Sequence, residues 1–282
     1  MAQTDPIFHV DTGVAEWIEP RGGFELTANT LSITSDYQGE KLRAAGLEPS
    51  AFGDTVDPSF FIGVGIQAGI RSGISAEGNV NMVQRLIQSR PVQLGEVLTV
   101  QGRIECVREV PRGHTVETSV TFEDASGTVV VDASRMSLRP DPDKGARRGA
   151  GERPPPVVPD PALAEVLGEH QLTPERVKSY SVQGNSIHYE EKAARRAGFR
   201  APMIGGGMGV HYLAALLWSH GAPQALDLSI YFRRPIFWDE RFTAAVLGKA
   251  DDRSSWRGLC LLRDEGEAGL KVLTEASIQE CL

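Results

Sequence analysis

An internal repeat constrains the fold of this chain more strongly than any other feature of its sequence. Residues 90–99 (Arg-Pro-Val-Gln-Leu-Gly-Glu-Val-Leu-Thr) align with residues 234–243 (Arg-Pro-Ile-Phe-Trp-Asp-Glu-Arg-Phe-Thr) at an offset of 144, since 234 − 90 = 144. The same offset aligns Pro58 with Pro202. A chain of 282 residues is long enough to give two such units a sizeable core. The repeat therefore predicts two halves of one architecture.

Each half is expected to contain a helix followed by several strands. The helices should begin near Pro58 and Pro202. Alternating apolar and β-branched residues predict strands at 98–107, 115–122 and 128–138, and again at 226–232, 242–247, 258–262 and 271–278. Residues 139–160 are rich in Pro, Gly and charged residues, which is typical of an extended linker. We therefore expect an N-terminal unit over 1–138, a linker over 139–160 and a C-terminal unit over 161–282.

A polar motif stands near the start of the C-terminal unit. It reads Gln-Gly-Asn-Ser-Ile-His from Gln183 to His188, then Gly-Phe at 198–199, then Pro-Met-Ile-Gly-Gly-Gly-Met at 202–208. The motif resembles the signature of the MaoC-like, or (R)-specific, 2-enoyl-CoA hydratases, which is Asp-x-Asn-Pro-(Ile/Leu)-His, then Gly-Phe, then Pro-x-x-His-Gly-Met. Three positions depart from that signature: Gln183 replaces the catalytic Asp, Ser186 replaces Pro and Gly205 replaces the second His.

The resemblance implies an α+β double hotdog fold. In a hotdog unit an antiparallel sheet wraps a long helix, and in the double form two fused units mimic the dimer of single-hotdog relatives. The helices that begin near Pro58 and Pro202 should then lie side by side. The two sheets should join into one, because pairing their edges removes exposed strand edges.

The resemblance also implies a hydratase or dehydratase that acts on acyl thioesters of CoA or acyl carrier protein. In the family an Asp and a His share the proton transfers, and a backbone N–H at a helix start stabilises the charge on the thioester oxygen. His188 and Gly206 occupy the matching positions here. Gln183 cannot exchange a proton, because an amide does not titrate, and it is expected to orient water or hold a substrate oxygen. We therefore predict His188, Gln183 and Gly206 as the catalytic residues.

The two halves are expected to play different roles. At the offset of 144, His188 aligns with Ala44 and Gly206 with Ile62, so the first half lacks the catalytic groups and is interpreted as the degenerate partner that shapes the acyl pocket. The predicted substrate contacts are Asn185, Gly205, Gly207, Phe60, Phe61 and Tyr231. For Asn185 a turn or a cap of a short helix at 189–197 is the more ordinary role. His211 and His220 are interpreted as core or surface histidines.

Composition disfavours several other classes of protein. The chain is 41% hydrophobic and 23% charged with a net charge of −8, which disfavours nucleic acid or an anionic membrane as a partner. Its three cysteines, Cys106, Cys260 and Cys281, are far apart and predict neither a metal site nor a disulfide framework. No cofactor is predicted. The sequence shows no signal peptide and no apolar run of membrane-spanning length, so we expect a cytoplasmic protein, with homodimer formation left open.

The missing Asp leaves two other functions open. The pocket could serve a repurposed double-hotdog enzyme that cyclises or isomerises a polyketide-like or acyl ligand. The chain could also be a non-catalytic acyl-binding subunit. Hydratase or dehydratase activity is favoured, because His188 and the Gly206 N–H both remain.

Overall fold

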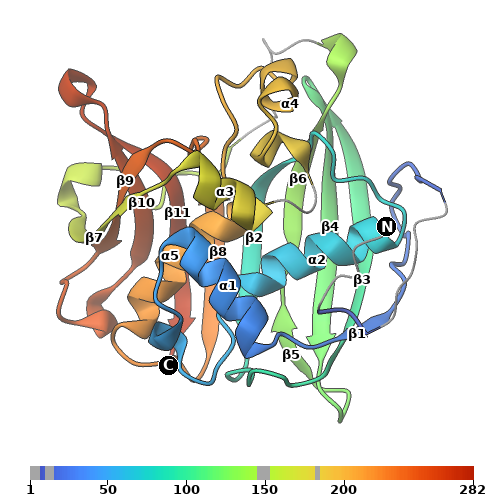
Figure 1. The fold of residues 1–282 in the computed structure, drawn as a ribbon, viewed down its shortest axis with the longest axis horizontal. Helices are drawn as coiled ribbons and strands as arrows, with labels where there is room; N and C mark the ends of the chain where they lie inside the picture. Colours follow the sequence, from blue (N-terminus) through green and yellow to red (C-terminus); the bar gives the residue numbers. More distant parts are fainter. Residues whose placement is uncertain (1–6, 10–15, 145–152, 182–184) are drawn as a thin grey trace.

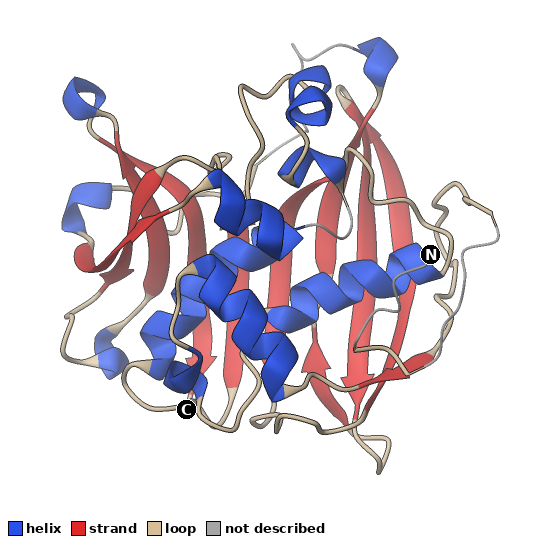
Figure 2. Cartoon of the chain, viewed as in Figure 1, coloured by secondary structure: helices blue, strands red, loops and turns tan. Residues whose placement is uncertain are grey.

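Two central helices, α2 (Phe60–Arg71) and α5 (Gly206–Trp218), lie across one face of a long antiparallel sheet (Figure 1). The structure is a computed structural model, and it describes residues 7–9, 16–144, 153–181 and 185–282. Figure 2 shows the shorter helices in front of the same face of the sheet or beyond its end. These are α1 (Ser35–Ala45), α3 (Pro174–Ser181) and α4 (Glu191–Arg196). Among the described residues, no helix is long and apolar enough to cross a membrane.

One sheet runs through both halves. Within the described ranges it contains eleven strands in the order β1-β3-β4-β5-β2-β8-β11-β10-β9-β7, with β6 paired to β2 and β4. The first-half strands are β1 (Asn29–Leu31), β2 (Val80–Gln88), β3 (Leu98–Val110), β4 (Gly113–Glu123), β5 (Val129–Asp132) and β6 (Arg135–Pro140). The second-half strands are β7 (Glu165–Gln171), β8 (Leu226–Phe232), β9 (Arg241–Leu247), β10 (Gly258–Asp264) and β11 (Leu270–Cys281).

The two halves are joined where β2 pairs with β8. These strands are antiparallel, and Arg85 is the partner of Ser229. Because 229 − 85 = 144, this pair consists of equivalent residues of the repeat and marks a local twofold axis between the halves. The predicted joining of the two sheets is confirmed.

The offset of the repeat at the loop before each central helix differs from the offset in the segment that follows the helix. In the first half, the Val56 N–H donates to the Val92 carbonyl at 2.8 Å; in the second, the Ile204 N–H donates to the Ile236 carbonyl at 2.9 Å. The acceptors are 144 residues apart (236 − 92), whereas the donors are 148 apart (204 − 56). The segment from this loop to the acceptor is therefore four residues shorter in the second half (204 to 236) than in the first (56 to 92).

This change corrects the sequence alignment at the start of α5. At an offset of 148 the counterpart of Gly206 is Pro58, since 206 − 148 = 58, and not Ile62 as the constant offset predicted. Proline has no backbone N–H. The first half therefore has no counterpart of the backbone donor predicted at Gly206, which is a physical reason for the two halves to differ in role.

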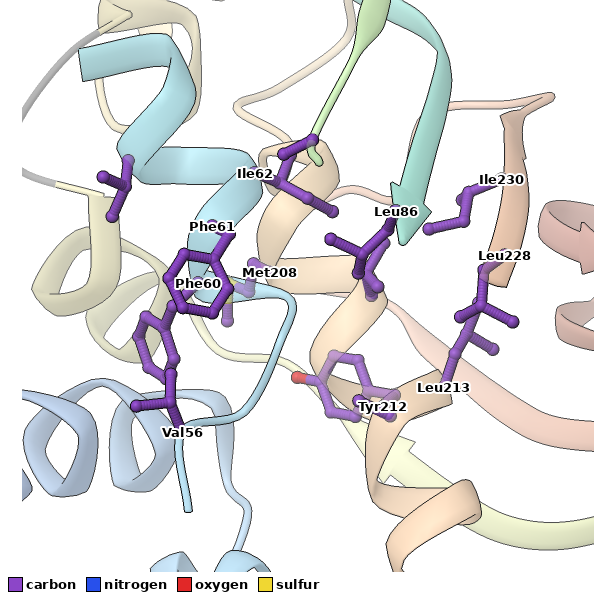
Figure 3. Packing of buried hydrophobic residues seen from close by; sticks show 14 of the residues in the cluster. Val56, Phe60, Phe61, Ile62, Leu86, Met208, Tyr212, Leu213, Leu228 and Ile230 are labelled. Carbon is purple, nitrogen blue, oxygen red and sulfur yellow. The ribbon is translucent and has the colours of Figure 1, made fainter. Parts of the chain in front are cut away.

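The core lies between the sheet and the two central helices. Phe61 of α2 is fully buried and packs against Phe122 of β4, with the ring centroids 4.8 Å apart. On α5, Met208, Tyr212 and Leu213 are also fully buried, and they lie near the apolar residues of the joined strands β2 and β8 (Figure 3). Such burial of apolar surface is the main stabilising contribution to the fold.

The helices α2 and α5 contact each other, as the sequence predicted. Small residues allow the approach: a Cβ added at Gly207 would lie 3.8 Å from both the Gly63 nitrogen and the Ser59 carbonyl oxygen. The N-terminal turns of the two helices therefore meet at the boundary between the halves.

Candidate active site

A cavity of about 640 Å³ is lined by residues of both halves. The first half contributes parts of α2, β2, β4 and β6 to its wall, and the second half contributes α3, the short 3-10 helix η4 (Ser186–His188), the start of α5 and β8. The predicted site residues that line it are Phe60, Asn185, His188, Gly205, Gly206, Gly207 and Tyr231. Gln183 lies outside the described residues.

His188 lines this cavity, and one nitrogen of its ring is held by the backbone. Its Nδ1 lies 2.8 Å from the carbonyl oxygen of Met203 and, because a carbonyl only accepts, Nδ1 carries the proton and donates it. In the neutral ring Nε2 then keeps its lone pair and can act as a base. A Cβ at Gly205 would lie 3.4 Å from Nε2, so the glycine leaves space beside the basic atom. Burial lowers the pKa of His188, and the bond to Met203 opposes that shift.

The lowered pKa of His188 predicts that its ring stays neutral in mildly acidic solution. Burial lowers the pKa below its ordinary value of 6.5, so the neutral base remains populated as the pH falls through 6.5. The unfolded chain takes up this proton first, so the free energy of unfolding should decrease below that pH. Proton NMR can follow the titration, with the His188 signal assigned by its loss in a His188→Asn variant. A midpoint at or above the ordinary value would contradict the prediction.

Gly206 is the first residue of α5, where backbone N–H groups point out of the helix end. The first hydrogen bond of the helix runs from the Gly209 N–H to the Gly205 carbonyl. The N–H of Gly206 therefore comes before the first N–H that is bonded within the helix. The first turn contains no acidic residue, and the helix dipole leaves it partly positive. A Cβ at Gly206 would lie 2.7 Å from the Cζ atom of Phe232. A side chain here would therefore displace the Phe232 ring, and the Gly206 N–H is suited to bind a developing oxyanion.

Asn185 holds the loop that carries His188. Its Oδ1 accepts from the Gly78 N–H at 3.1 Å, and its Nδ2 donates to the Asn79 carbonyl at 3.0 Å. The neighbouring Ser186 N–H donates to Glu77 at 3.1 Å. Asn185 also caps η4 and not the helix predicted at 189–197. The helix observed there is α4, which is shorter than predicted and begins at Glu191. Both polar atoms of its amide are occupied, so Asn185 positions His188 by fixing η4 to the first half.

The two predicted aromatic contacts from α2 differ. Phe60 lines the cavity, whereas Phe61 is turned into the core against Phe122 and is absent from the cavity wall. The reason is helical geometry, since adjacent residues of a helix point about 100° apart. Tyr231 lines the cavity with the guanidinium of Arg233 over its ring, 4.8 Å from the ring centroid.

A buried chain of polar side chains leads from the start of α2 to the cavity. The Nδ1 of His211 lies 2.7 Å from Asp57 Oδ2 and 2.5 Å from Ser59 Oγ, and its Nε2 lies 2.6 Å from the hydroxyl of Tyr180. Asp57 and His211 are completely buried, and Tyr180 lines the cavity. With the Nδ1 proton donated to the carboxylate, Nε2 accepts from Tyr180. Burial raises the pKa of Tyr180 well above its ordinary value, so the hydroxyl keeps its proton.

The sequence did not predict the hydrogen bonds that link Asp57, His211 and Tyr180. His211 was interpreted as an ordinary core or surface histidine because α5 is mostly apolar. Its partners Asp57 and Tyr180 are 154 and 31 residues away in the sequence, so no local spacing could indicate them. Among the described residues, no group of three or more His, Cys, Asp or Glu side chains is arranged to hold a metal ion.

The two fused units, their central helices and their shared sheet define a double hotdog fold. No protein-family model matches the sequence, and the search of curated proteins gave no match.

Solved structures confirm the fold. The chain is similar to HtdX from Mycobacterium tuberculosis, with a TM-score of 0.68 and 20% identity over 90% of this chain and 97% of that one. It is similar to a MaoC-like dehydratase from Phytophthora capsici, with a TM-score of 0.66 and 16% identity over 91% and 96% of the two chains. A further M. tuberculosis protein, described as having a double hotdog fold, has a TM-score of 0.60 and 14% identity over 93% and 96%. At these identities the likeness establishes the fold.

Proposed function

We propose that this protein is a hydratase or dehydratase of acyl thioesters. It would interconvert a 2-enoyl thioester and a 3-hydroxyacyl thioester of CoA or acyl carrier protein. The observation that carries the proposal is that a histidine with an unprotonated Nε2 and a helix N-terminus at Gly206 belong to the wall of one cavity. The structural likeness to a MaoC-like dehydratase supports the same class of reaction. In this proposal residues 161–282 supply the chemistry and residues 1–138 shape the acyl pocket.

The reaction can be written with His188 as the base. In the hydration direction, Nε2 takes a proton from water as the water oxygen bonds to the β-carbon. The electron pair of the double bond moves toward the thioester carbonyl, and the Gly206 N–H donates a hydrogen bond to the resulting oxyanion. The protonated imidazole then gives its proton to the α-carbon, which completes the addition of water and restores the neutral base. Dehydration is the reverse sequence.

Tyr180 is proposed to orient the attacking water. Because its hydroxyl proton is donated to His211, the lone pairs of its oxygen remain available to accept a hydrogen bond. A water that gives one proton to His188 needs an acceptor for the other, and the carboxylate of the family signature is absent from the sequence. Asp57 and His211 fix the rotation of the hydroxyl.

The Tyr180→Phe variant should lower kcat by about 10- to 100-fold with little change in KM. The reason is that general base catalysis by His188 depends on the placement of the water that gives up its proton, and the variant loses the oxygen that orients this water. Steady-state kinetics on one enoyl thioester would measure both constants. Tyr37→Phe is a matched control, since Tyr37 also lines the cavity but is absent from the hydrogen bonds to His211. Unchanged kcat in a folded Tyr180→Phe variant would remove Tyr180 from the mechanism.

Mass spectrometry of enoyl thioesters incubated with the protein tests the proposed class of reaction. The expected product has gained the mass of one water. An isomerised or cyclised product without that gain would favour the repurposed enzyme, and tight binding without any product would favour the acyl-binding subunit. A panel of short, long and branched acyl groups on CoA and on acyl carrier protein would show which carrier and chain the pocket accepts.

A further inference from the structure

The cavity wall carries an excess of positive charge, although the whole chain has a net charge of −8. Among the described residues that line the cavity there is no Asp or Glu. The cationic residues that line it are Lys41, Arg112, Arg135, Arg153, Arg233 and Arg234. Several of these cations already have protein partners: Arg233 pairs with Glu275, and Arg234 donates to the Val272 carbonyl at 2.7 Å.

Arg135 differs from these residues because its charge has no counterion within the part of the chain that the structure describes. Its Nη1 is buried without any hydrogen-bond partner, and no described carboxylate forms an ion pair with its guanidinium. By contrast, Arg90 pairs with Glu96 at 2.6 Å. Burial lowers the pKa of Arg135 to about 10, which still leaves the group charged at neutral pH. A buried, uncompensated cation is unfavourable unless a ligand supplies the opposite charge.

The position of Arg135 places this charge in the first half of the cavity. It is the first residue of β6, and its guanidinium lies against α2: a Cβ at Gly65 would be 3.6 Å from Nη1, and one at Gly69 would be 3.5 Å from Nη2. The glycines at these two helix positions therefore leave room for the guanidinium between helix and sheet.

Two hydroxyl groups flank Arg135 on the same face of the sheet. Thr118 of β4 is its direct cross-strand partner. Ser137 lies two residues along β6 and therefore points to the same face. Both line the cavity with Arg135. A guanidinium between two hydroxyl donors matches the geometry and charge of a carboxylate.

We propose that Arg135 binds a carboxylate at the far end of the acyl group, so that the substrate is the thioester of a dicarboxylic acid. This inference rests on the proposed function, which assigns the first half to the acyl group. An apolar acyl chain would leave the guanidinium without a partner, whereas a terminal carboxylate would neutralise it and accept from Thr118 and Ser137. Phosphates of CoA are the other anion that could reach this cavity, and the test separates the two sources.

Isothermal titration with saturated thioesters tests the inference without requiring turnover. The ligands are succinyl-, glutaryl- and adipyl-CoA, their neutral counterparts butyryl-, valeryl- and hexanoyl-CoA, and free CoA. For the chain length that fits, we expect the carboxylated thioester to bind about 10- to 100-fold more tightly than its neutral counterpart, as a charge-assisted bidentate contact provides. Arg135→Gln should abolish this preference without changing the affinity for free CoA, and Arg135→Lys should restore part of it.

The matched control is Arg108→Gln, because Arg108 is an exposed residue of the first half outside the cavity wall; it should keep the preference. Thermal unfolding of each variant would establish that it folds. Equal affinity for carboxylated and neutral ligands in the wild-type protein would overturn the inference. So would an Arg135→Gln variant that loses as much affinity for free CoA as it loses for the carboxylated thioester. If no 2-enoyl thioester, with or without a terminal carboxylate, is hydrated while the binding preference holds, the proposed reaction fails and the binding role of Arg135 stands.

Discussion

Replacing His188 with Ala is expected to lower kcat/KM on an enoyl thioester by about 10²- to 10⁴-fold, the range typical of a general acid–base residue. The effect should be at the upper end, because in the proposed mechanism His188 both takes the proton from water and returns it to the α-carbon. The measurement is steady-state hydration of the best thioester of the panel. Turnover unchanged from wild type would exclude His188 as the base.

Two variants separate the chemistry of His188 from its structural role. His188→Asn can keep a donor near the position of Nδ1, and so the bond to the Met203 carbonyl, but it has no basic nitrogen. We expect it to unfold at nearly the wild-type temperature and to be as inactive as His188→Ala. His114→Ala removes an exposed histidine of β4 and should be fully active. An active His188→Asn variant would show that the residue only holds the loop.

Replacing Gly206 with Ala is expected to have the second largest effect. The new Cβ would lie 2.7 Å from the Cζ atom of Phe232, so the ring or the helix start has to move. Overpacking of this kind costs about 1–3 kcal/mol in the free energy of unfolding. Displacing an oxyanion donor costs about 10²- to 10³-fold in kcat. Urea unfolding and steady-state kinetics would measure the two effects.

Gly209→Ala is the matched control for Gly206→Ala. It places the same methyl group on the same helix, where its nearest contacts are ordinary ones: Ile204 at 3.7 Å, Leu261 at 3.8 Å and Thr274 at 3.9 Å. Because Ala is favoured over Gly inside a helix by about 1 kcal/mol, this variant should be as stable as the wild type or more so, and it should keep its activity. A Gly206→Ala variant as active as Gly209→Ala would show that the oxyanion is bound elsewhere.

The sequence was sufficient to predict the double hotdog fold because a repeat reports on both halves at once. The offset of 144 recurs at the Arg85–Ser229 pair, where the sheets join. A constant offset could not predict the offset of 148 at the start of the central helices, because a four-residue difference in length beyond that point leaves the later strands aligned at 144. The alignment of Gly206 with Ile62 was therefore wrong, and the true counterpart, Pro58, became evident only from backbone hydrogen bonds.

The motif also identified several residues that line the cavity, because His188 and Gly205 to Gly207 lie close together in the sequence. Arg135 of the first half and Tyr180 of the second half were not predicted. Arg135 and Tyr180 reach the cavity from β6 and α3, and their environments are set by residues far away in the chain. Phe61 was placed on the pocket although it lies in the core, because apolar residues at adjacent helix positions do not reveal which of them faces the cavity.

Running the reaction in deuterated water tests the central claim most directly. If His188 transfers a proton from water to the α-carbon as the water oxygen bonds to the β-carbon, the product gains one water and one non-exchangeable deuterium at the α-carbon. The His188→Ala variant should produce neither. Deuterium at the α- or γ-carbon without a new hydroxyl group would contradict hydration and indicate isomerisation. Recovery of unchanged substrate after incubation with the wild-type protein would contradict any enzymatic action on enoyl thioesters.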